Sequence, residues 1–225
     1  MKNKTIAIIP ARGNSKRLPN KNTLLLDGIP LLVHSILYAQ KNSKLIDAIY
    51  VSTDDAANKE IALRYDVTVI DRPDQISGDN EPTVSCLKHV LESINDEVEN
   101  VVLLQPTNPF RPADLLKECF RKFTTSACDC LFTVSQNHQK FGKIVDDKFI
   151  PFNYKFGQRS QDLEPLYYEN GLLYITKANA ILNDKIITEN AFPFVVNHIF
   201  ATIDIDTQDD FDYAKFIVNT YIEKY

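Results

Sequence analysis

Short apolar runs alternate with segments of helical pattern over the first 134 residues, and this order constrains the fold of the chain most. Runs rich in aliphatic residues lie at 6–9, 49–52, 67–70, 101–104 and 131–134. Their short length and apolar character are typical of buried strands in a parallel sheet. The order βαβαβαβαβ predicts an α/β fold with a Rossmann-like, doubly wound and mostly parallel sheet, which binds ligands at the carboxyl ends of its strands.

The segments between these runs carry helix signals. Pro30 can open a helix because its fixed φ suits the first turn, and Thr53–Asp55 can cap another. Residues 84–94 place apolar side chains at helical spacing. We expect helices near 31–38, 56–65, 84–94, 113–123, 178–183 and 211–222. We also expect strands at 171–175 and 200–206 and a polar loop at 71–82.

Residues 136–170 break the alternation. They hold five basic and seven aromatic residues and show little periodicity. A stretch of this length without clear elements is usually functional or packed against a partner. We therefore interpret residues 1–225 as a single domain with an insertion at about 136–170. The insertion is expected to be a small hairpin or arm that covers the site and forms a dimerisation subdomain. The alternative is that these residues form an ordinary surface loop with no role in the site or in a dimer.

Size and charge narrow the class of protein. A chain of 225 residues, 44% of them hydrophobic, fits one globular domain with a sizeable core. The net charge of −5 argues against a nucleic-acid partner and favours a small anion met by local positive charge. No apolar run approaches the ~20 residues of a membrane span. Four cysteines without a C-x-x-C pair suit buried thiols in a reducing compartment, so we expect a cytoplasmic protein with no membrane partner.

A basic loop follows the first apolar run. Its basic side chains are those of Arg12, Lys16, Arg17 and Lys21. No acidic residue precedes Asp27, and such a loop at the end of a first strand suits the phosphates of a nucleotide. Gly13, Asn14 and Ser15 can bring backbone N–H groups to those phosphates. The spacing fits neither common glycine-rich phosphate fingerprint, so a plain polar surface loop is the alternative.

Two aspartates near the end of the chain form the second informative site. In an extended segment, Asp204 and Asp206 point to the same side while Ile203 and Ile205 pack behind them. Two carboxylates on one face repel each other unless a cation or ligand lies between them. Mg²⁺ bound through one or two carboxylates and substrate phosphates is the natural occupant. A strand end with a helix cap at Thr207 is the structural alternative, and both can hold.

Four motifs, in order, resemble those of the CMP–nonulosonic acid synthetases, the acylneuraminate cytidylyltransferases. The opening motif IIPARGNSKRLPNKN covers 8–22, and LQPTNPFR covers 104–111. The later motifs are NGLLYI at 170–175 and IDIDT at 203–207. Together these matches span nearly the whole chain. They are consistent with the phosphoryl or nucleotidyl transfer that the basic loop and aspartate pair favour, since such chemistry depends on positioning and charge neutralisation.

The resemblance implies that CTP and a nine-carbon 2-keto sugar acid react to give a CMP-sugar and diphosphate, with Mg²⁺ (or Mn²⁺) bound. The anomeric hydroxyl would attack the α-phosphorus. The implied CTP-binding residues are Ala11, Arg12, Gly13, Asn14, Ser15, Lys16, Lys21, Asn22, Arg72 and Thr83. The implied sugar-binding residues are Gln105, Lys140, Arg159 and Asn170. The implied catalytic residues are Arg12, Lys21, Asp204 and Asp206, the two aspartates being the metal ligands.

Several alternatives stay open at this point. Asp204 is also a candidate to deprotonate the sugar hydroxyl, and Lys143 can replace Lys140 at the sugar carboxylate. Tyr168–Glu169 stands where some sialic acid enzymes have Arg-Pro, so the sequence does not identify the sugar. A CMP–Kdo synthetase or another sugar nucleotidyltransferase is the second hypothesis, and a non-catalytic nucleotide-binding protein is the third. The resemblance also implies a homodimer, which the aromatic arm makes physically reasonable.

Overall fold

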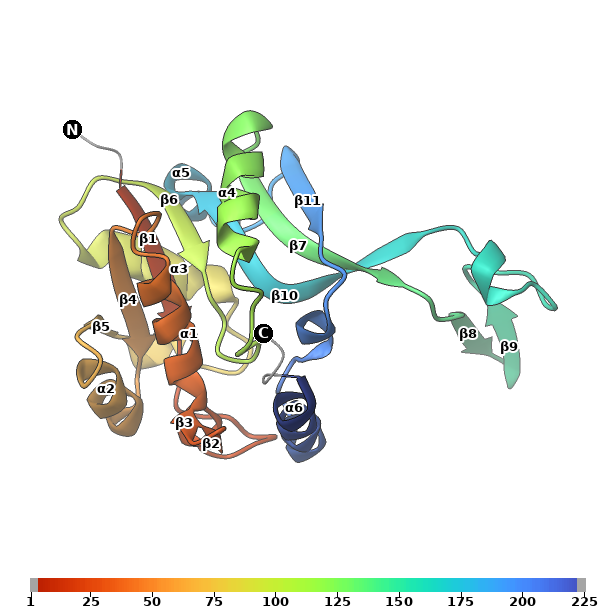
Figure 1. Cartoon of the computed structure of the whole chain (residues 1–225), viewed down its shortest axis with the longest axis horizontal. Coiled ribbons are helices and arrows are strands. Elements are labelled where there is room, and N and C mark those ends of the chain that lie inside the picture. Colours follow the sequence, from red (N-terminus) through yellow and green to blue (C-terminus); the bar gives the residue numbers. More distant parts are fainter. Residues whose placement is uncertain (1–3, 222–225) are drawn as a thin grey trace.

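One central sheet organises the molecule (Figure 1). The computed structural model describes residues 4–221, and in this part of the chain seven strands have the order β11-β7-β10-β6-β1-β4-β5. Their bounds are β1 (Lys4–Pro10), β4 (Ala48–Thr53), β5 (Thr68–Asp71), β6 (Val98–Leu103), β7 (Cys130–Asn137), β10 (Leu166–Lys177) and β11 (Ala191–Val195). All neighbours pair in parallel except β10, which is antiparallel to both β6 and β7.

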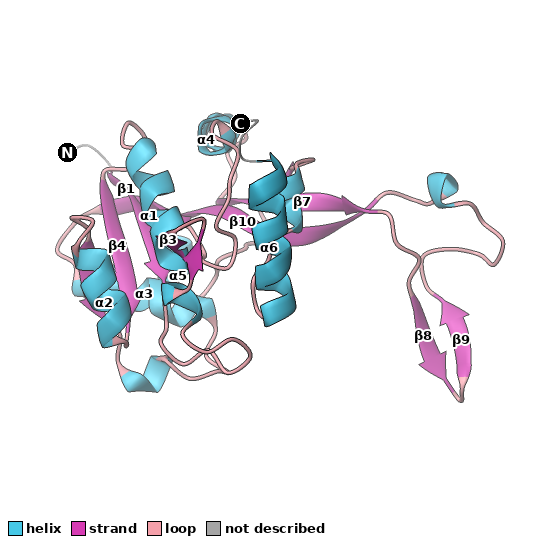
Figure 2. Cartoon of the chain, turned by 60° about the horizontal axis from the view of Figure 1, so that its bottom comes forward, coloured by secondary structure: helices cyan, strands magenta, loops and turns pink. Residues whose placement is uncertain are grey.

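Helices cover both faces of this sheet (Figure 2). On one face lie α1 (Leu31–Lys41), α2 (Ala56–Leu63) and α4 (Leu115–Thr125); on the other lie α3 (Thr83–Ser93) and α5 (Ala178–Leu182). Because side chains alternate along a strand, Ala7 and Ile9 of β1 pack with α1, while Ile6 and Ile8 pack with α3. The sheet is therefore buried on both sides, which confirms the predicted doubly wound, mostly parallel fold.

A third apolar cluster lies under α6 (Gln208–Tyr221). It joins Phe211 and Ile217 of α6 to Ile203 and Ile205 just before the helix, and to Leu18 of the basic loop. Burial of these side chains holds the basic loop after β1 against the segment that precedes α6. The helix begins with the predicted cap, because Thr207 N–H donates to Asp210 Oδ2 at 2.8 Å and Asp210 N–H to Thr207 Oγ1 at 3.3 Å.

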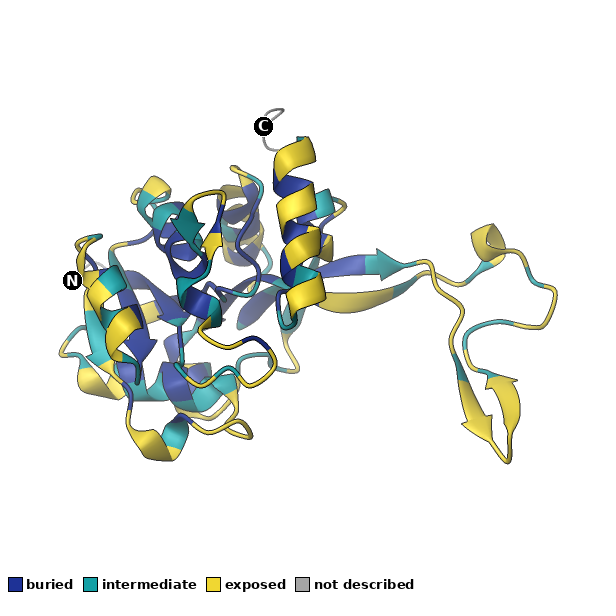
Figure 3. Cartoon of the chain, turned by 90° about the horizontal axis from the view of Figure 1, so that it is seen from below, coloured by how far each residue is buried: buried dark blue, intermediate teal, exposed yellow. Residues whose placement is uncertain are grey.

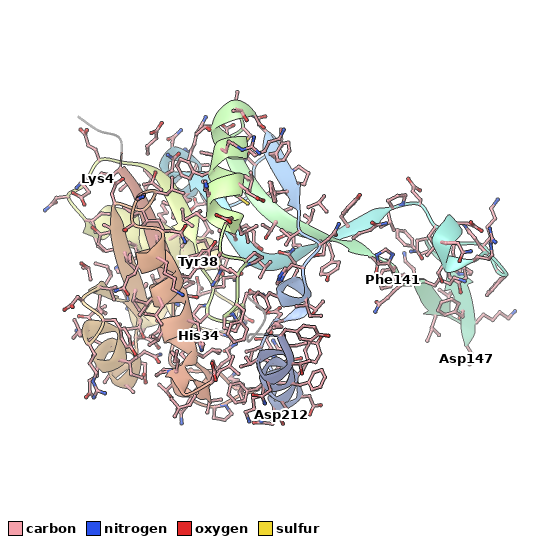
Figure 4. All side chains as sticks on the ribbon, in the orientation of Figure 1. Lys4, His34, Tyr38, Phe141, Asp147 and Asp212 are labelled. Carbon is pink, nitrogen blue, oxygen red and sulfur yellow. The ribbon has the colours of Figure 1, made fainter. Side chains whose placement is uncertain are left out.

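An arm extends from β7 and β10 (Figure 1). Beyond this strand pair lie a hairpin of β8 (Gly142–Val145) and β9 (Lys148–Pro151) and a short 3₁₀ helix, η3 (Ser160–Asp162). Figure 4 places Phe141 at the base of this hairpin and Asp147 at its far end. The predicted hairpin or arm is confirmed. The expectation that it covers the site of its own chain is wrong, because the arm points away from the body and its residues are mostly exposed (Figure 3).

The predicted helices are confirmed, but one predicted strand is not. All six predicted helices are present with shifted ends, and the predicted end of the last one, Ile222, lies outside the described residues. The strand predicted at 200–206 is wrong. Residues Ile199–Thr202 form a 3₁₀ helix, η4, and the extended residues that follow have no strand partner, because their apolar side chains pack under α6 instead. Between residues 4 and 221, none of the helices has the length and apolar character needed to cross a membrane.

Sequence reasoning also misses some elements. These are β11, the two-residue strands β2 (Leu25–Leu26) and β3 (Ile29–Pro30), and the 3₁₀ helices η1 (Lys21–Thr23) and η2 (Asp74–Ile76). The strand β11 contains Pro193, which sequence patterns read as a break. It is tolerated because β11 is the edge strand of the sheet and pairs only with β7.

Candidate active site

The carboxyl ends of β1, β5 and β6 open into one cavity of about 220 Å³. The basic loop after β1, the segment after β5, the loop after β6 and the residues before α6 supply its walls. Of the residues predicted for the site, it brings together Arg12, Ser15, Lys21, Asn22, Arg72, Thr83, Gln105 and Asp206. A position at the carboxyl edge of a parallel sheet is where doubly wound folds bind ligands.

A second cavity, of about 470 Å³, adjoins the first. Gly13, Asn14 and Lys16 line it, and Ser15, Gly78 and Asp79 line both cavities. The segment at Gly78–Asp79 therefore separates two spaces that lie along the same basic loop.

The basic loop is held tightly to the end of β4. Gly13 N–H donates to Asp54 Oδ1 at 2.8 Å, and a Cβ atom on Gly13 would lie 2.7 Å from Asp55 Cβ, so only glycine fits without displacement. Ser15 N–H donates to the Gly13 carbonyl. The N–H groups of Gly13 and Ser15 are therefore both engaged within the protein, and their predicted contact with phosphates stays a prediction. Ala11 is fully buried beneath the loop.

Lys21 joins the basic loop to the segment that carries the two aspartates. Its ammonium donates to Asp206 Oδ1 and to the Ile205 carbonyl, each at 2.9 Å. Arg17 contacts the other oxygen of Asp206 at 2.6 Å. Asn22 is nearly buried and donates to the Arg12 carbonyl at 2.9 Å, which fixes the loop on which Arg12 lies. The first and last motifs of the sequence thus meet in one set of contacts.

Asp79 occupies the cationic side of the cavity. Its carboxylate lies 2.6 Å from Lys16 Nζ and 3.2 Å from Arg12 Nη1, and Arg12 also donates to the Gly78 carbonyl at 2.9 Å. The hydrogen bond from Lys16 is the main cause that lowers the pKa of Asp79. Sequence reasoning missed this residue, because the contact joins the loop after β5 to the loop after β1 and no local pattern indicates it.

The predicted nucleotide residues after β5 lie at the back of the first cavity. Arg72 is 8% exposed and donates to the hydroxyl and the carbonyl of Ser52, at 3.2 Å and 2.9 Å. Thr83 is the first residue of α3 and lines the cavity, as does Cys86 one turn later. Burial raises the pKa of the Cys86 thiol.

The proline-rich loop after β6 is fixed by Arg111, which sequence reasoning missed. Its guanidinium donates to the Leu172 carbonyl at 2.6 Å and to the Gln105 carbonyl at 2.9 Å, and it lies over the ring of Tyr38. Burial lowers the pKa of Arg111 to about 10. This arginine therefore sets where Gln105 enters the cavity.

Side chains alternate between buried and more exposed at residues 203–206, as predicted, although this segment is not a strand. Ile203 and Ile205 are buried, whereas Asp204 and Asp206 face outward, and Asp206 lines the cavity. Loss of hydration raises the pKa of Asp204, repulsion by Asp206 adds to this, and a hydrogen bond from Thr107 opposes it.

A divalent cation fits this donor set. Between residues 4 and 221, no three His, Cys, Asp or Glu side chains gather as metal ligands, so protein atoms alone do not complete a site. Asp204 and Asp206 supply the hard oxygen donors that Mg²⁺ prefers, and Mg²⁺ commonly takes its remaining ligands from phosphates and water. To bind the ion, Asp206 would exchange a contact with Lys21 or Arg17 for the metal, which frees that cation for a phosphate. The residues present therefore fit the metal in the presence of a bound nucleotide.

Three predicted sugar-binding residues do not line this cavity. Lys140 donates to the Gln158 carbonyl and Arg159 pairs with Asp162, both within the arm. Asn170 is buried, and its side chain bonds Thr133 Oγ1 at 2.6 Å and Ser135 Oγ at 3.0 Å. In this chain Asn170 holds β10 to β7, and only Gln105 of the predicted sugar set reaches the cavity.

Comparison with known proteins places the chain in a class: residues 6–223 match the cytidylyltransferase family, and the chain belongs to it. It is 35% identical over 216 residues to an N-acylneuraminate cytidylyltransferase of Streptococcus agalactiae serotype III, covering 92% of this chain and 52% of that protein. It is 32% identical over 218 residues to a CMP-N,N'-diacetyllegionaminic acid synthase of Legionella pneumophila, covering 91% of this chain and 92% of that protein. The resemblance seen in the motifs is thus confirmed.

The chain spans about half the length of the first of these relatives and nearly all of the second. Among solved structures, a CMP:2-keto-3-deoxy-manno-octonic acid synthetase complexed with CTP superposes with a TM-score of 0.71 at 14% identity, covering 96% of this chain and 98% of that one. At this identity the likeness supports the fold alone.

Proposed function

We propose that this protein is a cytidylyltransferase that activates a nonulosonic, sialic-type acid with CTP. The observation that carries the proposal is the contact of Lys21 Nζ with Asp206 Oδ1 at 2.9 Å, which joins the basic loop to the aspartate pair at the carboxyl edge of the sheet. The named relatives act on N-acylneuraminate or make CMP-N,N'-diacetyllegionaminic acid, which supports this substrate class.

The reaction replaces a phosphoanhydride bond of CTP with a phosphate ester bond to the sugar. The anomeric hydroxyl oxygen of the sugar acid forms a bond to the α-phosphorus of CTP, the bond from that phosphorus to the oxygen leading to the β-phosphate breaks, and the hydroxyl proton is released. The products are the CMP-sugar and diphosphate. Positioning and neutralisation of charge dominate such chemistry.

Side chains of the basic loop would bind the triphosphate. Arg12 and Lys16 line adjoining cavities, and Lys21 is largely shielded from water, so its charge is less screened than that of a surface lysine. Asn22, Arg72 and Thr83 would form the nucleoside side of the cavity. Gln105 lies on the loop after β6, where the acceptor would approach the α-phosphate.

Asp204 and Asp206 would hold Mg²⁺ or Mn²⁺ together with phosphate oxygens. The bound ion supplies neutralisation of the negative charge on the reacting phosphate. Asp206 contacts Lys21 and Arg17, so those two cations would keep its carboxylate oriented toward the cavity before the nucleotide binds. Asp204 also remains our candidate for accepting the hydroxyl proton.

We further propose that residues 1–225 act as one catalytic domain and that the arm pairs two copies into a homodimer. The arm carries exposed apolar side chains such as Ile144, Phe152 and Phe156, which a partner surface would cover. Since Lys140 and Arg159 do not reach the cavity of their own chain, they can contact a sugar carboxylate only in the partner's cavity.

Diphosphate release tests the proposal. The purified protein is incubated with CTP, Mg²⁺ and, in turn, N-acetylneuraminic, legionaminic, pseudaminic and Kdo acids, with a pyrophosphatase-coupled phosphate assay as readout. Release with one of the three nonulosonic acids supports the proposal. Release with Kdo alone would move the enzyme to the Kdo class, and CTP binding without release would indicate a non-catalytic nucleotide-binding protein.

A further inference from the structure

Asn108 connects three of the motifs that build the site. Its side chain is 1% exposed, and its Nδ2 group donates to the Ile203 carbonyl at 2.7 Å and to the Asn170 carbonyl at 3.1 Å. This one amide group therefore uses both of its protons to join the motif after β6 to the bend in β10 and to the segment that carries the aspartates. The next residue back, Thr107, accepts a hydrogen bond from Ile205 N–H at 2.9 Å.

The surroundings of Asn108 are closely packed. Gly171 has φ +74°, and a Cβ atom there would lie 2.7 Å from Asn108 Oδ1, so the amide occupies the space that a side chain at Gly171 would need. Thr107 Oγ1 lies 3.2 Å from the same oxygen. Buried polar groups satisfied in this way have one low-energy arrangement, because losing a partner leaves a buried carbonyl without a donor.

The aspartates need such a support because no strand ladder holds them. Residues 203–206 belong to no strand, and the carbonyl that accepts from Asn108 belongs to the residue immediately before Asp204. Apolar packing of Ile203 and Ile205 fixes which side faces inward, but it fixes the position along the chain less precisely than directional hydrogen bonds do.

We propose that Asn108 is a positioning residue that sets the placement of the two aspartates for the divalent cation. The proposal rests on the proposed function, in which Asp204 and Asp206 bind the metal with CTP. Asn108 contacts neither the metal ligands' carboxylates nor the cavity; it acts through the backbone of the segment that carries them. Groups that orient metal ligands from behind typically change metal affinity 10–100-fold when removed.

The test compares Mn²⁺ binding by Asn108→Ala with binding by the wild-type chain. Enhancement of water proton relaxation is measured as protein is titrated into Mn²⁺ and CTP, and CTP binding without metal is measured by calorimetry. We expect at least a tenfold weaker Mn²⁺ interaction in Asn108→Ala and a less than twofold change in metal-free CTP binding. Asn108→Ser keeps one hydrogen-bond donor, so its Mn²⁺ affinity should lie between those of the wild type and Asn108→Ala. It replaces the alanine variant in the test if that variant does not fold.

Asn100→Ala is the matched control. Asn100 is also a buried asparagine, but it lies in β6 away from the cavity and donates to Thr5 Oγ1 at 3.3 Å. The substitution Asn100→Ala should lower the melting temperature while leaving the Mn²⁺ affinity within twofold of the wild type. If Asn108→Ala lowers the melting temperature but leaves Mn²⁺ binding unchanged, its role is only structural and the proposal fails. If the wild-type chain with CTP binds no Mn²⁺, the metal assignment in the proposed function fails as well.

Discussion

Substitution of Gly171 by alanine tests how closely the bend in β10 is packed against Asn108. The backbone at Gly171 has φ +74°, a left-handed conformation that costs a residue with a Cβ atom about 1–2 kcal/mol. The new Cβ atom would also lie 2.7 Å from Asn108 Oδ1 and 3.2 Å from its Cγ atom. Overpacking of this kind in a buried site typically costs about 1–3 kcal/mol. We therefore expect Gly171→Ala to lower the free energy of unfolding by about 2–5 kcal/mol.

Gly28→Ala isolates the packing contribution. Gly28 has nearly the same backbone angle, φ +72°, but nothing lies within 4 Å of a Cβ atom there, so this variant should lose only about 1–2 kcal/mol. Urea unfolding followed by circular dichroism measures both free energies. In a chain of this size each kcal/mol shifts the melting temperature by roughly 2–4 °C, so thermal scans provide a second readout. Equal destabilisation by the two substitutions would refute the contact between Gly171 and Asn108.

Three further predictions follow from the site and the core. Asp79→Asn removes the carboxylate that pairs with Arg12 and Lys16 in the basic loop, so calorimetry should show several-fold tighter binding of inorganic triphosphate than in the wild type. Glu81→Gln is the control, and unchanged binding by Asp79→Asn would mean that Asp79 does not compete with phosphates. Lys21→Met should lower the rate of diphosphate release by about 100-fold or more, because its charge acts in a shielded site, and near-normal turnover would exclude Lys21 from the mechanism. Burial raises the pKa of Cys119 to about 12, so above about pH 9 the unfolded chain loses this proton first, and this thiol alone should lower the free energy of unfolding by about 1.4 kcal/mol per pH unit. In urea unfolding, Cys119→Ala should show a pH slope shallower by this amount, and an unchanged slope would contradict the role of this thiol.

Local sequence signals located the sheet and half of the site. The runs that became β1, β4 and β6 are apolar because both of their faces are buried, and that composition is visible without any tertiary information. The edge strand β5 is only partly buried and was found by its short apolar run. Since parallel strands bring their carboxyl ends to one edge, the loops just after β1 and β6 could be placed together from the sequence. Arg72 and the role of Gln105 were implied only by the resemblance of the motifs to a known family.

Long-range contacts account for what the sequence did not predict. The residues at 200–206 have strand-like alternation, but whether such a segment enters a sheet depends on which neighbour offers a free edge, and here α6 covers them instead. The contact of Asp79 with Lys16 joins residues 63 positions apart, and nothing local to either residue indicates it. The direction of the arm likewise depends on how β7 and β10 leave the sheet, which the composition of residues 136–170 does not determine.

A ³¹P nuclear magnetic resonance experiment tests the central claim most directly. The protein is incubated with CTP, Mg²⁺ and the nonulosonic acid that gives the strongest diphosphate release. We predict that the three signals of CTP are replaced by equal amounts of one phosphodiester signal, from the CMP-sugar, and of diphosphate. Appearance of inorganic phosphate with CDP, or an unchanged CTP spectrum with every acid tried, would contradict the assignment of this chain as a cytidylyltransferase for sugar acids.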